Sequence, residues 1–474
     1  MSEIRYEGYI TPCRIFSNIY FVGTRPASTH IIETGEGLIL VDPGYSRDLD
    51  KVLENIKTVG LDIKDIKIIL LTHGHGDHAG AVAELVELTG ASVYIGAGDL
   101  PMVSGRVDSG YSIANTFMPD RLLNDGDRFS LGETEIYCIS TPGHTDGTIS
   151  FFFDVTDGEN TYRAGMFGGA GTNTLTGKYL CTHRMPLSNR EKFLSSIERL
   201  RGERVEIFLG NHVGNNDTEG KIAKVMAGDK YAFLDPDGWF EFLTERENRL
   251  LTVIKEEEEE MKNTVEKILE EKLIMIVRGV DPEKTVELAE AMYRGGVRLM
   301  ECTYDATGKT PDETVAKTIE TLAKRFEGRM LIGAGTVLTK KQVQLTSAAG
   351  GRFIISPDTN PEIIEETKKA GMVSIPGGLT PSEATLANRS GADFVKLFPI
   401  SQNGAGYVKA LRAPLSHIRF LAVGGVTADN ATDYMKNGAC GVGMGLGADD
   451  RNAIESGDWD YIENKYRELV KKLK

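Results

Sequence analysis

Six consecutive residues of this chain contain four side chains that can bind a metal. They are His73, His75, Asp77 and His78 in the sequence His-Gly-His-Gly-Asp-His. Imidazole and carboxylate groups are the usual ligands of catalytic zinc and related metals. The chain has only eight histidines. Three of them in one short segment therefore indicate a bound cation rather than ordinary surface composition.

Two further histidines lie where a backbone turn can bring them to the same ion. His144 lies in the glycine-containing turn 141–148, and His212 directly follows the predicted strand 205–209. Glycine lets the backbone bend closely around an ion, because it has no Cβ. We therefore expect both histidines to join the cluster.

A second kind of chemistry is predicted around Lys396. This lysine lies in the apolar segment 392–399. Burying a charged amine is costly, so its pKa should fall, and a neutral amine can attack a carbonyl to form an iminium. The alternative from this segment alone is a lysine whose stem is buried while its ammonium reaches solvent.

The elements of the first half place the histidine cluster at a strand end. Short strands are predicted at Ile19–Val22, Thr29–Ile32 and Leu38–Val41, and the apolar run Ile66–Leu71 has the character of a buried strand. Ligands of α/β folds commonly lie at the carboxyl ends of such strands. Further strands are expected at 92–95, 134–140, 148–153, 162–167 and 205–209, which predicts a layered α/β domain.

Five consecutive glutamates, Glu256–Glu260, mark a boundary. A block of like charge is expected to be exposed, on a helix face or in a linker. We therefore predict a first domain over residues 1–255, an acidic linker over 256–261 and a second domain over 262–474.

The second domain alternates strands and helices regularly. Eight strand–helix units in this length predict a (β/α)₈ barrel. The expected strands cover residues 273–277, 298–303, 330–333, 353–356, 372–375, 393–398, 419–423 and 440–442.

Bulk properties exclude several classes of function. A length of 474 residues predicts two or three domains, and a net charge of −15 argues against nucleic acid and anionic membranes as partners. No apolar run approaches the roughly 20 residues of a membrane span, and the first ten residues lack the apolar core of a signal peptide. Five scattered cysteines fit a reducing compartment. We expect a cytoplasmic enzyme that acts on small molecules.

With its histidines in this pattern, the segment 1–255 resembles the metallo-β-lactamase superfamily of hydrolases. The resemblance implies an αββα sandwich and one or two zinc or other divalent ions. His73, His75 and His144 would hold one ion, and Asp77, a ligand and catalytic residue, would hold the second with His78 and His212. It also implies Asp42 as a buried supporting carboxylate, and hydrolysis of an ester, lactone, thioester or lactam.

One departure from that family concerns the strand 162–167. Many members carry a metal-bridging aspartate at its end, where this chain has Met166 and no carboxylate. One subclass of β-lactamases also lacks that aspartate, and this half is most similar to it. The glycine-rich segment 168–174 beside it either contacts the site or is a flexible loop chosen for turn geometry.

The second half has several glycine-containing motifs at strand ends: 333–337, 355–357, 375–383 and 423–426, together with Lys-Leu-Phe-Pro at 396–399. They resemble the aldolases that cleave 2-keto-3-deoxy-6-phosphogluconate and 4-hydroxy-2-oxoglutarate. The resemblance covers residues 262–474 and implies a homotrimer. It implies Lys396 as the Schiff-base lysine, Glu301 as general acid/base, Thr336 at the pyruvyl carboxylate, Pro357 as a further substrate-binding residue, and Arg278, Gly424 and Gly425 at a distal anion site.

Two positions differ from the aldolase pattern. Asp305 stands where some members carry an arginine for the substrate carboxylate, and Met444 stands where a phosphate-binding serine is expected. Each change weakens the expected binding of anions. The substrate is therefore either a non-phosphorylated 2-oxo acid or an anion held in another way.

The sequence thus predicts a bifunctional enzyme of sugar-acid catabolism. A metal-dependent hydrolase would open a lactone, and an aldolase would cleave the resulting acid to pyruvate and an aldehyde. Two alternatives stay open. The hydrolase half could act on an unrelated β-lactam or thioester, and the aldolase-like half could serve binding or assembly without catalysis.

Overall fold

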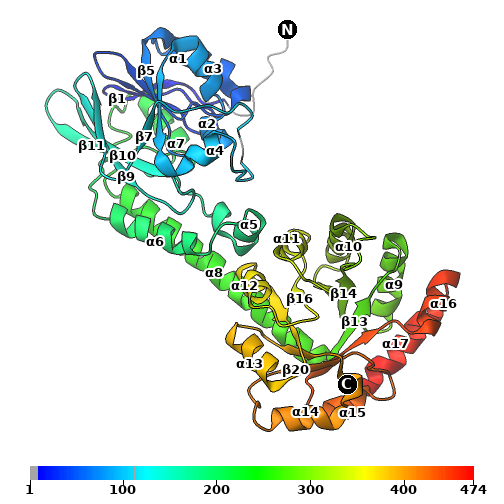
Figure 1. Cartoon of the computed structure of the whole chain (residues 1–474). Helices are drawn as coiled ribbons and strands as arrows, with labels where there is room; N and C mark the ends of the chain where they lie inside the picture. Colours follow the sequence, from blue (N-terminus) through cyan, green and yellow to red (C-terminus); the bar gives the residue numbers. More distant parts are fainter. Residues whose placement is uncertain (1–8, 112) are drawn as a thin grey trace. The chain divides into compact units, whose positions relative to one another are not determined.

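The computed structural model describes residues 9–111 and 113–474. The chain divides into two compact units (Figure 1). The first comprises residues 1–175 and 186–252, and the second comprises 176–185 and 253–474. The short segment 176–185 therefore belongs to the second unit, although the sequence places it within the first half.

The first unit contains two stacked sheets. Strands β1 to β4 pair antiparallel, and β4 to β7 pair parallel. In the second sheet β8 to β11 pair antiparallel, and β12 pairs parallel with β11. The first sheet consists of β1 (Cys13–Phe16), β2 (Ile19–Phe21), β3 (His30–Glu33), β4 (Leu38–Val41), β5 (Ile66–Leu70), β6 (Ser92–Gly96) and β7 (Arg121–Leu123). The second consists of β8 (Arg128–Leu131), β9 (Thr134–Ser140), β10 (Ile149–Thr156), β11 (Thr161–Met166) and β12 (Ile207–Phe208).

Helices cover the outer face of each sheet, so the layered α/β prediction is confirmed as an αββα sandwich. One core lies between the sheets, and another lies between the first sheet and helices α1 and α3. On the far side, Trp239 of α8 packs against Phe152 and Phe208 of the second sheet. The helices are α1 (Leu49–Thr58), α2 (Gly76–Ala79), α3 (Val82–Thr89), α4 (Leu100–Val103), α6 (Ser188–Leu200), α7 (Thr218–Met226) and α8 (Gly238–Glu271).

The acidic run does not form an extended linker. Glu256–Glu260 lie inside α8, a helix of 34 residues that begins in the first unit and ends in the second. Its last turns carry Met261, Val265, Ile268 and Leu269 against the interior residues of the barrel. Their spacing is that of one apolar helix face, which explains why the chain stays helical beyond the glutamates.

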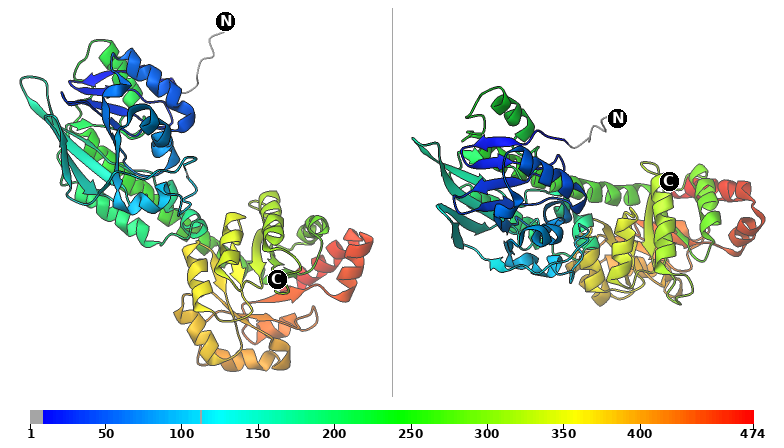
Figure 2. Two further views of the ribbon diagram at one scale, coloured as in Figure 1. Left: turned by 45° about the horizontal axis from the view of Figure 1, so that its top comes forward. Right: turned by 90° about the horizontal axis from the view of Figure 1, so that it is seen from above.

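The second unit is a closed parallel barrel surrounded by helices (Figure 2). Strands β17 and β18 stand at the two ends of its strand order, yet only Pro376 separates them in the chain. They therefore act as one strand, which closes a ring of eight and confirms the predicted (β/α)₈ fold. The strands are β13 (Leu273–Val277), β14 (Leu299–Thr303), β15 (Leu331–Gly335), β16 (Phe353–Ile355), β17 (Val373–Ile375), β18 (Gly377–Gly378), β19 (Val395–Leu397), β20 (Phe420–Val423) and β21 (Gly441–Gly445).

A ring of helices packs on the outside of these strands. Its apolar contacts form the largest core of the unit, and α5 joins it through Cys181. The helices are α5 (Gly177–Thr182), α9 (Pro282–Arg294), α10 (Asp312–Arg325), α11 (Lys340–Ala348), α12 (Pro361–Lys369), α13 (Pro381–Arg389), α14 (Ala405–Arg412), α15 (Ala431–Lys436), α16 (Ala448–Ser456) and α17 (Trp459–Leu473). Among residues 9–111 and 113–474, none of the helices combines the length and apolar character that crossing a bilayer requires.

Candidate active sites

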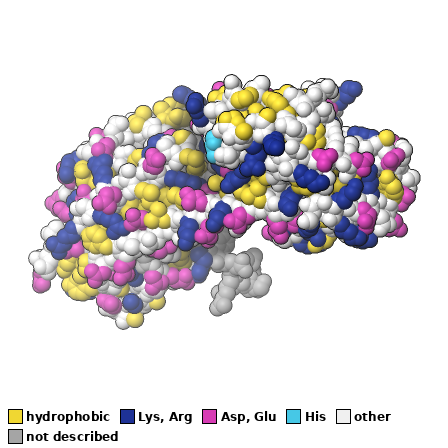
Figure 3. All heavy atoms as spheres, turned by 90° about the horizontal axis from the view of Figure 1, so that it is seen from below, with side chains coloured by type: hydrophobic (Ala, Val, Ile, Leu, Met, Phe, Trp, Pro, Cys, Tyr) yellow, Lys and Arg dark blue, Asp and Glu magenta, His cyan; other side chains and the backbone are white. Residues whose placement is uncertain are grey.

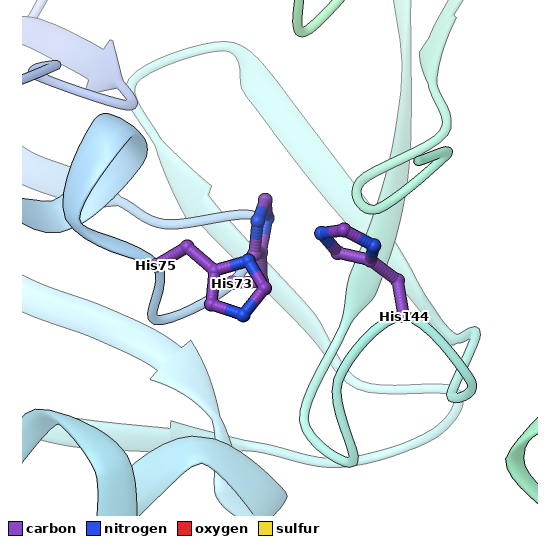
Figure 4. A group of neighbouring side chains, drawn as sticks. All are labelled: His73, His75 and His144. Atoms are coloured by element: carbon purple, nitrogen blue, oxygen red, sulfur yellow. The ribbon is translucent and has the colours of Figure 1, made fainter. Parts of the chain in front are cut away.

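The first histidine group lies where two loops of the first unit meet. His73 and His75 follow β5, and His144 lies in the turn between β9 and β10. One ring nitrogen of each lies within 4.8 Å of the others, and the three rings converge in Figure 4. All three side chains are buried. The predicted first set of ligands is thus brought together.

A second group lies beside the first. His78 Nε2 is 3.2 Å from His212 Nε2, and Asp77 Oδ2 lies 3.4 Å from His78 and 3.6 Å from His212. One carboxylate and two imidazole nitrogens at this separation form a donor set that suits a divalent cation. The structure therefore places the predicted second set of ligands together as well.

The ring nitrogens that point away from the cluster are held by hydrogen bonds. His78 Nδ1 donates to Asp42 at 2.8 Å, His144 Nδ1 donates to the Gly171 carbonyl at 2.8 Å, and His212 Nδ1 donates to the Pro26 carbonyl at 2.7 Å. Each bond fixes the tautomer and leaves Nε2 as the electron-pair donor.

His73 is oriented in the same way through an intermediate hydroxyl. Thr72 donates its hydroxyl to Asp42 at 2.7 Å, so His73 Nδ1 is the donor in its 3.0 Å contact with that hydroxyl. His73 Nε2 is then buried with no hydrogen-bond partner among the described residues. A buried, unpartnered nitrogen is costly unless it binds something, and a cation satisfies it.

The electrostatics differ between the two groups. Burial lowers the pKa of His73 and His144, which keeps their rings neutral and ready to coordinate. Burial also acts to lower the pKa of His78, but Asp42 and Asp77 outweigh it and raise that pKa to about 10. A cation bound at the second group therefore displaces a proton.

Asp99 is a residue of this site that the sequence analysis missed. Its carboxylate accepts from the Gly74 N–H, the Gly147 N–H and the Thr145 hydroxyl, each at 2.8 Å. It thereby joins the loop of His73 and His75 to the loop of His144. Burial raises the pKa of Asp99 to about 6, although these bonds oppose the shift. A lone aspartate before a short helix carried no signal in the sequence.

Two other segments near the cluster can now be placed. The glycine-rich segment 168–174 contacts the site, since Gly171 accepts from His144. Met166, which stands where a bridging aspartate is often found, is buried in the core between the sheets. No carboxylate comes from the end of β11 to join the two groups.

The barrel brings Lys396 and Glu301 to one small interior cavity. Lys396 lies in β19 and Glu301 in β14, and the rest of the cavity wall is apolar. Burial lowers the pKa of Lys396, and Glu301 opposes that shift. Burial raises the pKa of Glu301 to about 7, opposed by Lys396 and Arg278. The pair therefore holds an amine that is easier to deprotonate beside a carboxyl that titrates near neutrality.

Glycine at position 335 makes room for that carboxylate. A Cβ there would lie 2.2 Å from Glu301 Oε1, so a larger residue would displace the carboxylate. Glu301 Oε2 is buried and has no hydrogen-bond partner among the described residues. This oxygen is free to act on a substrate proton.

Arg278 and Thr336 meet at the mouth of the barrel. They follow β13 and β15, and Arg278 Nη2 donates to the Thr336 hydroxyl at 2.9 Å. Both line an opening of about 680 Å³ that also includes Thr303, Asp305 and Lys309. Thr336 has a left-handed backbone, with φ of 57°, a strained conformation for a β-branched residue that is typical of functional loops.

Gly424 and Gly425 follow β20 in left-handed conformations, with φ of 90° and 77°. A Cβ on Gly424 would meet the Phe398 ring at 2.9 Å, and one on Gly425 would meet Ser401 at 2.5 Å. Phe398 itself lies with its ring centre 4.6 Å from Lys396 Nζ. Pro357 follows β16, and a Cβ on Gly377 would lie 2.3 Å from the Pro357 carbonyl oxygen.

The two departures from the aldolase pattern have structural roles. Asp305 accepts from the Thr307 N–H, the Thr307 hydroxyl and the Thr310 N–H at 2.7–3.0 Å, so it holds its own loop together. Met444 packs in the outer core of the barrel. Neither side chain supplies a donor to an anion at the mouth.

Comparison with known proteins separates the two halves. The family model for KDPG and KHG aldolases matches residues 265–465. The probable 2-dehydro-3-deoxy-6-phosphogalactonate aldolase of Rhizobium meliloti is 38% identical over 178 residues, which cover 37% of this chain and 81% of that protein. The 2-dehydro-3-deoxy-6-phosphogalactonate aldolase of Escherichia coli is 34% identical over 174 residues, which cover 36% of this chain and 82% of that protein.

The first half matches a different family. The model for the metallo-beta-lactamase superfamily covers residues 22–158. The crystal structure of BJP-1, a subclass B3 metallo-beta-lactamase of Bradyrhizobium japonicum, superposes with a TM-score of 0.50 and 25% identity. The superposition covers 54% of this chain and 98% of the BJP-1 chain. The chain belongs to the KDPG and KHG aldolases, and its first half is similar to the metallo-beta-lactamase superfamily. Its metallo-beta-lactamase domain and its aldolase domain come from families of enzymes, hydrolases and lyases respectively, which act on small molecules.

Proposed function

We propose that this protein is a bifunctional enzyme of sugar-acid catabolism. Its aldolase domain would cleave a 2-keto-3-deoxy sugar acid, phosphorylated or not, or a 4-hydroxy-2-oxo acid, to pyruvate and an aldehyde. Its metallo-beta-lactamase domain would hydrolyse a lactone or other ester-like bond. The observation that carries the proposal is the shared burial of Lys396 and Glu301 in one cavity of the barrel.

In the aldolase domain, the neutral Lys396 amine attacks the C2 carbonyl of the substrate, and loss of water gives an iminium. Glu301 then takes the proton of the C4 hydroxyl, directly or through a water. The C3–C4 bond breaks, its electrons move to the iminium, and the aldehyde leaves. A proton returned to C3 and hydrolysis of the iminium release pyruvate and restore Lys396. A carboxyl with a pKa of about 7 suits both proton transfers.

Substrate anions would be held at the mouth. Thr336 is proposed to bind the pyruvyl carboxylate. The backbone N–H groups of Gly424 and Gly425, with Arg278, remain the proposed distal anion site, and Pro357 remains a proposed wall of the pocket. The absence of a hydroxyl at Met444, where a phosphate-binding serine is expected, favours a substrate whose distal end is a hydroxyl rather than a phosphate.

In the metallo-beta-lactamase domain, His73, His75 and His144 would hold one zinc or similar ion, and Asp77, His78 and His212 a second. Such an ion acts as a Lewis acid on a carbonyl and acidifies water. The residues fit it, because His73 Nε2 is buried without a partner and the Nδ1 atoms of four histidines are already engaged. Asp42 orients two of these rings, and Asp77, held within reach of both second-group rings, would orient water for attack.

A coupled assay tests the link between the domains. Lactones of 2-keto-3-deoxy sugar acids are added to the intact protein, to His73→Ala and to Lys396→Met, and lactone loss and pyruvate are both measured. We expect pyruvate only from the intact protein, and lactone loss without pyruvate from Lys396→Met. His73→Ala should still release pyruvate from the open acid. Equal pyruvate release from lactone by the intact protein and His73→Ala would refute the link.

A second candidate is favoured by the similarity to BJP-1, which is a metallo-beta-lactamase. In this alternative the first domain hydrolyses a β-lactam or a thioester, and the aldolase domain serves binding or assembly. Reduction with borohydride in the presence of pyruvate separates the two. We expect a stable mass addition on Lys396 that persists in Lys309→Met, since Lys309 only lines the opening. An intact protein that gains no mass would support the non-catalytic alternative.

The cellular setting is also proposed. All five cysteines are free, which supports a reducing cytoplasm. Acidic side chains lie among the basic ones on the face shown in Figure 3, and the net charge of −15 disfavours nucleic acid and anionic membranes as partners. A homotrimer built through the aldolase domain remains a proposal, and sedimentation equilibrium of the full chain would test it.

A further inference from the structure

A second large cavity lies at the opposite end of the barrel from Lys396. Its volume is about 700 Å³. Arg298, Met330 and Arg352 line it, and these residues immediately precede β14, β15 and β16. Thr336 follows β15 at the catalytic mouth. A five-residue strand is about 16 Å long, so the cavity is separate from the proposed aldolase site.

The lining of this cavity is basic, although the chain as a whole is acidic. Three acidic side chains line it: Glu260, Glu320 and Glu327. Six basic side chains line it: Lys178, Lys267, Arg298, Lys324, Arg329 and Arg352. In a protein with 69 acidic and 54 basic residues, this local excess of positive charge favours an anionic ligand.

Three of the six cations are already neutralised. Arg352 pairs with Glu260, Lys324 pairs with Glu320 at 2.6 Å, and Lys267 pairs with Glu271 at 2.9 Å. The remaining lining carboxylate, Glu327, is exposed to solvent. The other three cations are therefore available to a ligand.

Arg298, Arg329 and Lys178 form no ion pair with any described residue. Arg298 donates to the carbonyls of Tyr293 and Val297 at 2.9 and 2.8 Å, and Arg329 donates to the Arg325 carbonyl. The guanidinium carbons of Arg298 and Arg329 lie 4.3 and 5.3 Å from the centre of the same ring, that of Tyr293. Two like charges beside one ring, neither in an ion pair with a described residue, are stabilised when an anion binds to both.

We propose that this cavity binds a small molecule through a phosphate or carboxylate group, held by Arg298, Arg329 and Lys178. Guanidinium groups match the geometry of such oxyanions through paired N–H donors. The volume lies within the roughly 300–1,000 Å³ of small-molecule sites. Barrel enzymes place catalysis at the carboxyl ends of the strands, so a ligand at this end acts as an effector and not as the substrate. The site does not depend on the reaction proposed above.

Calorimetric titration of the full chain tests the site, with inorganic phosphate and malonate as separate probes. We expect at least one probe to bind. Arg329→Ala and Lys178→Ala should each weaken that binding about tenfold or more, the usual loss for a hydrogen bond to a charged group. The matched control is Arg389→Ala, an exposed arginine on α13 outside the cavity. Arg278→Ala controls for anions bound at the catalytic mouth. Arg389→Ala should bind within about twofold of the unchanged protein, and Arg278→Ala should keep the binding event that Arg329→Ala loses.

Several outcomes would overturn the proposal. These are no heat from either probe, equal binding by Arg329→Ala and the unchanged chain, or loss of binding in Arg278→Ala alone. If the basic face instead pairs with a second copy of the chain, the protein should assemble in a concentration-dependent way. Arg329→Ala should then disrupt that assembly, and neither probe should bind. Circular dichroism of each variant checks its folding. This check is needed because Arg329 also donates a hydrogen bond to the Arg325 carbonyl at the end of α10.

Discussion

The two domains prepare their reactive side chains by opposite physical means. In the metallo-beta-lactamase domain, six ligand-type side chains from separate loops converge, and hydrogen bonds from behind leave their inner nitrogens facing one another. In the aldolase domain, one lysine and one glutamate stand in the barrel among apolar residues, and burial shifts both pKa values. The first site needs a bound cation to complete it. In the second site, the apolar surroundings set the pKa values of the reactive groups.

The two sites should therefore respond differently to the same disturbance. A site assembled around a cation depends on that cation and on the residues that orient its ligands. A site tuned by burial depends on the exclusion of water and on the space around its carboxyl group. The following predictions test this difference, beginning with the largest effect.

Removal of metal should separate the two activities completely. After dialysis against a chelator, we expect hydrolysis to fall by about three orders of magnitude or more, because a Lewis acid contributes several kcal/mol to such reactions. Cleavage of the open 2-oxo acid should change less than about twofold. Hydrolysis, aldol cleavage and metal content are measured on the same sample. A parallel loss of aldol cleavage would contradict independent sites.

Glu301→Gln should lower the rate of aldol cleavage by about 10²–10⁴, the usual contribution of a general acid/base. Lys396 remains in place, so borohydride trapping with pyruvate should still succeed.

The pH profile sharpens this prediction. The ionised form of Glu301 takes the C4 hydroxyl proton, and its pKa is about 7. The cleavage rate should therefore rise as pH increases through 7 in the unchanged enzyme. In Glu301→Gln that step should vanish. An unaltered step in the variant would assign the titration to another group.

Asp42→Asn should have the smallest of the three effects. The amide keeps the size of the side chain but loses the charge that orients His78 and Thr72. Changes to such supporting residues typically cost about 10–100-fold in metal affinity. Competition with a chromogenic chelator measures the affinity, and Glu36→Ala, an exposed acidic change in the same domain, serves as the control. Equal metal affinities for Asp42→Asn and Glu36→Ala would show that Asp42 does not support the metal site.

Local pattern predicted much of the fold because the signals were strong. The apolar run before the histidine cluster became β5, and Leu273–Val277 became β13 with the predicted bounds. The acidic run was harder to interpret, because exposed charge is compatible with both a linker and a helix. The apolar face of α8 that follows the glutamates packs in the barrel, which favours a continuous helix.

The sequence by itself determined which side chains could do chemistry. The cluster from His73 to His78, the apolar surroundings of Lys396 and the lack of a carboxylate at Met166 are all local facts, set by spacing along the chain.

Only the tertiary structure decided what those side chains meet. Asp99 joins two ligand loops, Arg278 contacts Thr336, and Lys178 lines one cavity with Arg298 and Arg329. Each of these contacts links residues from about 25 to 150 positions apart in the chain. Neither residue type nor local periodicity carries that information, because it is created when the sheets stack and the barrel closes.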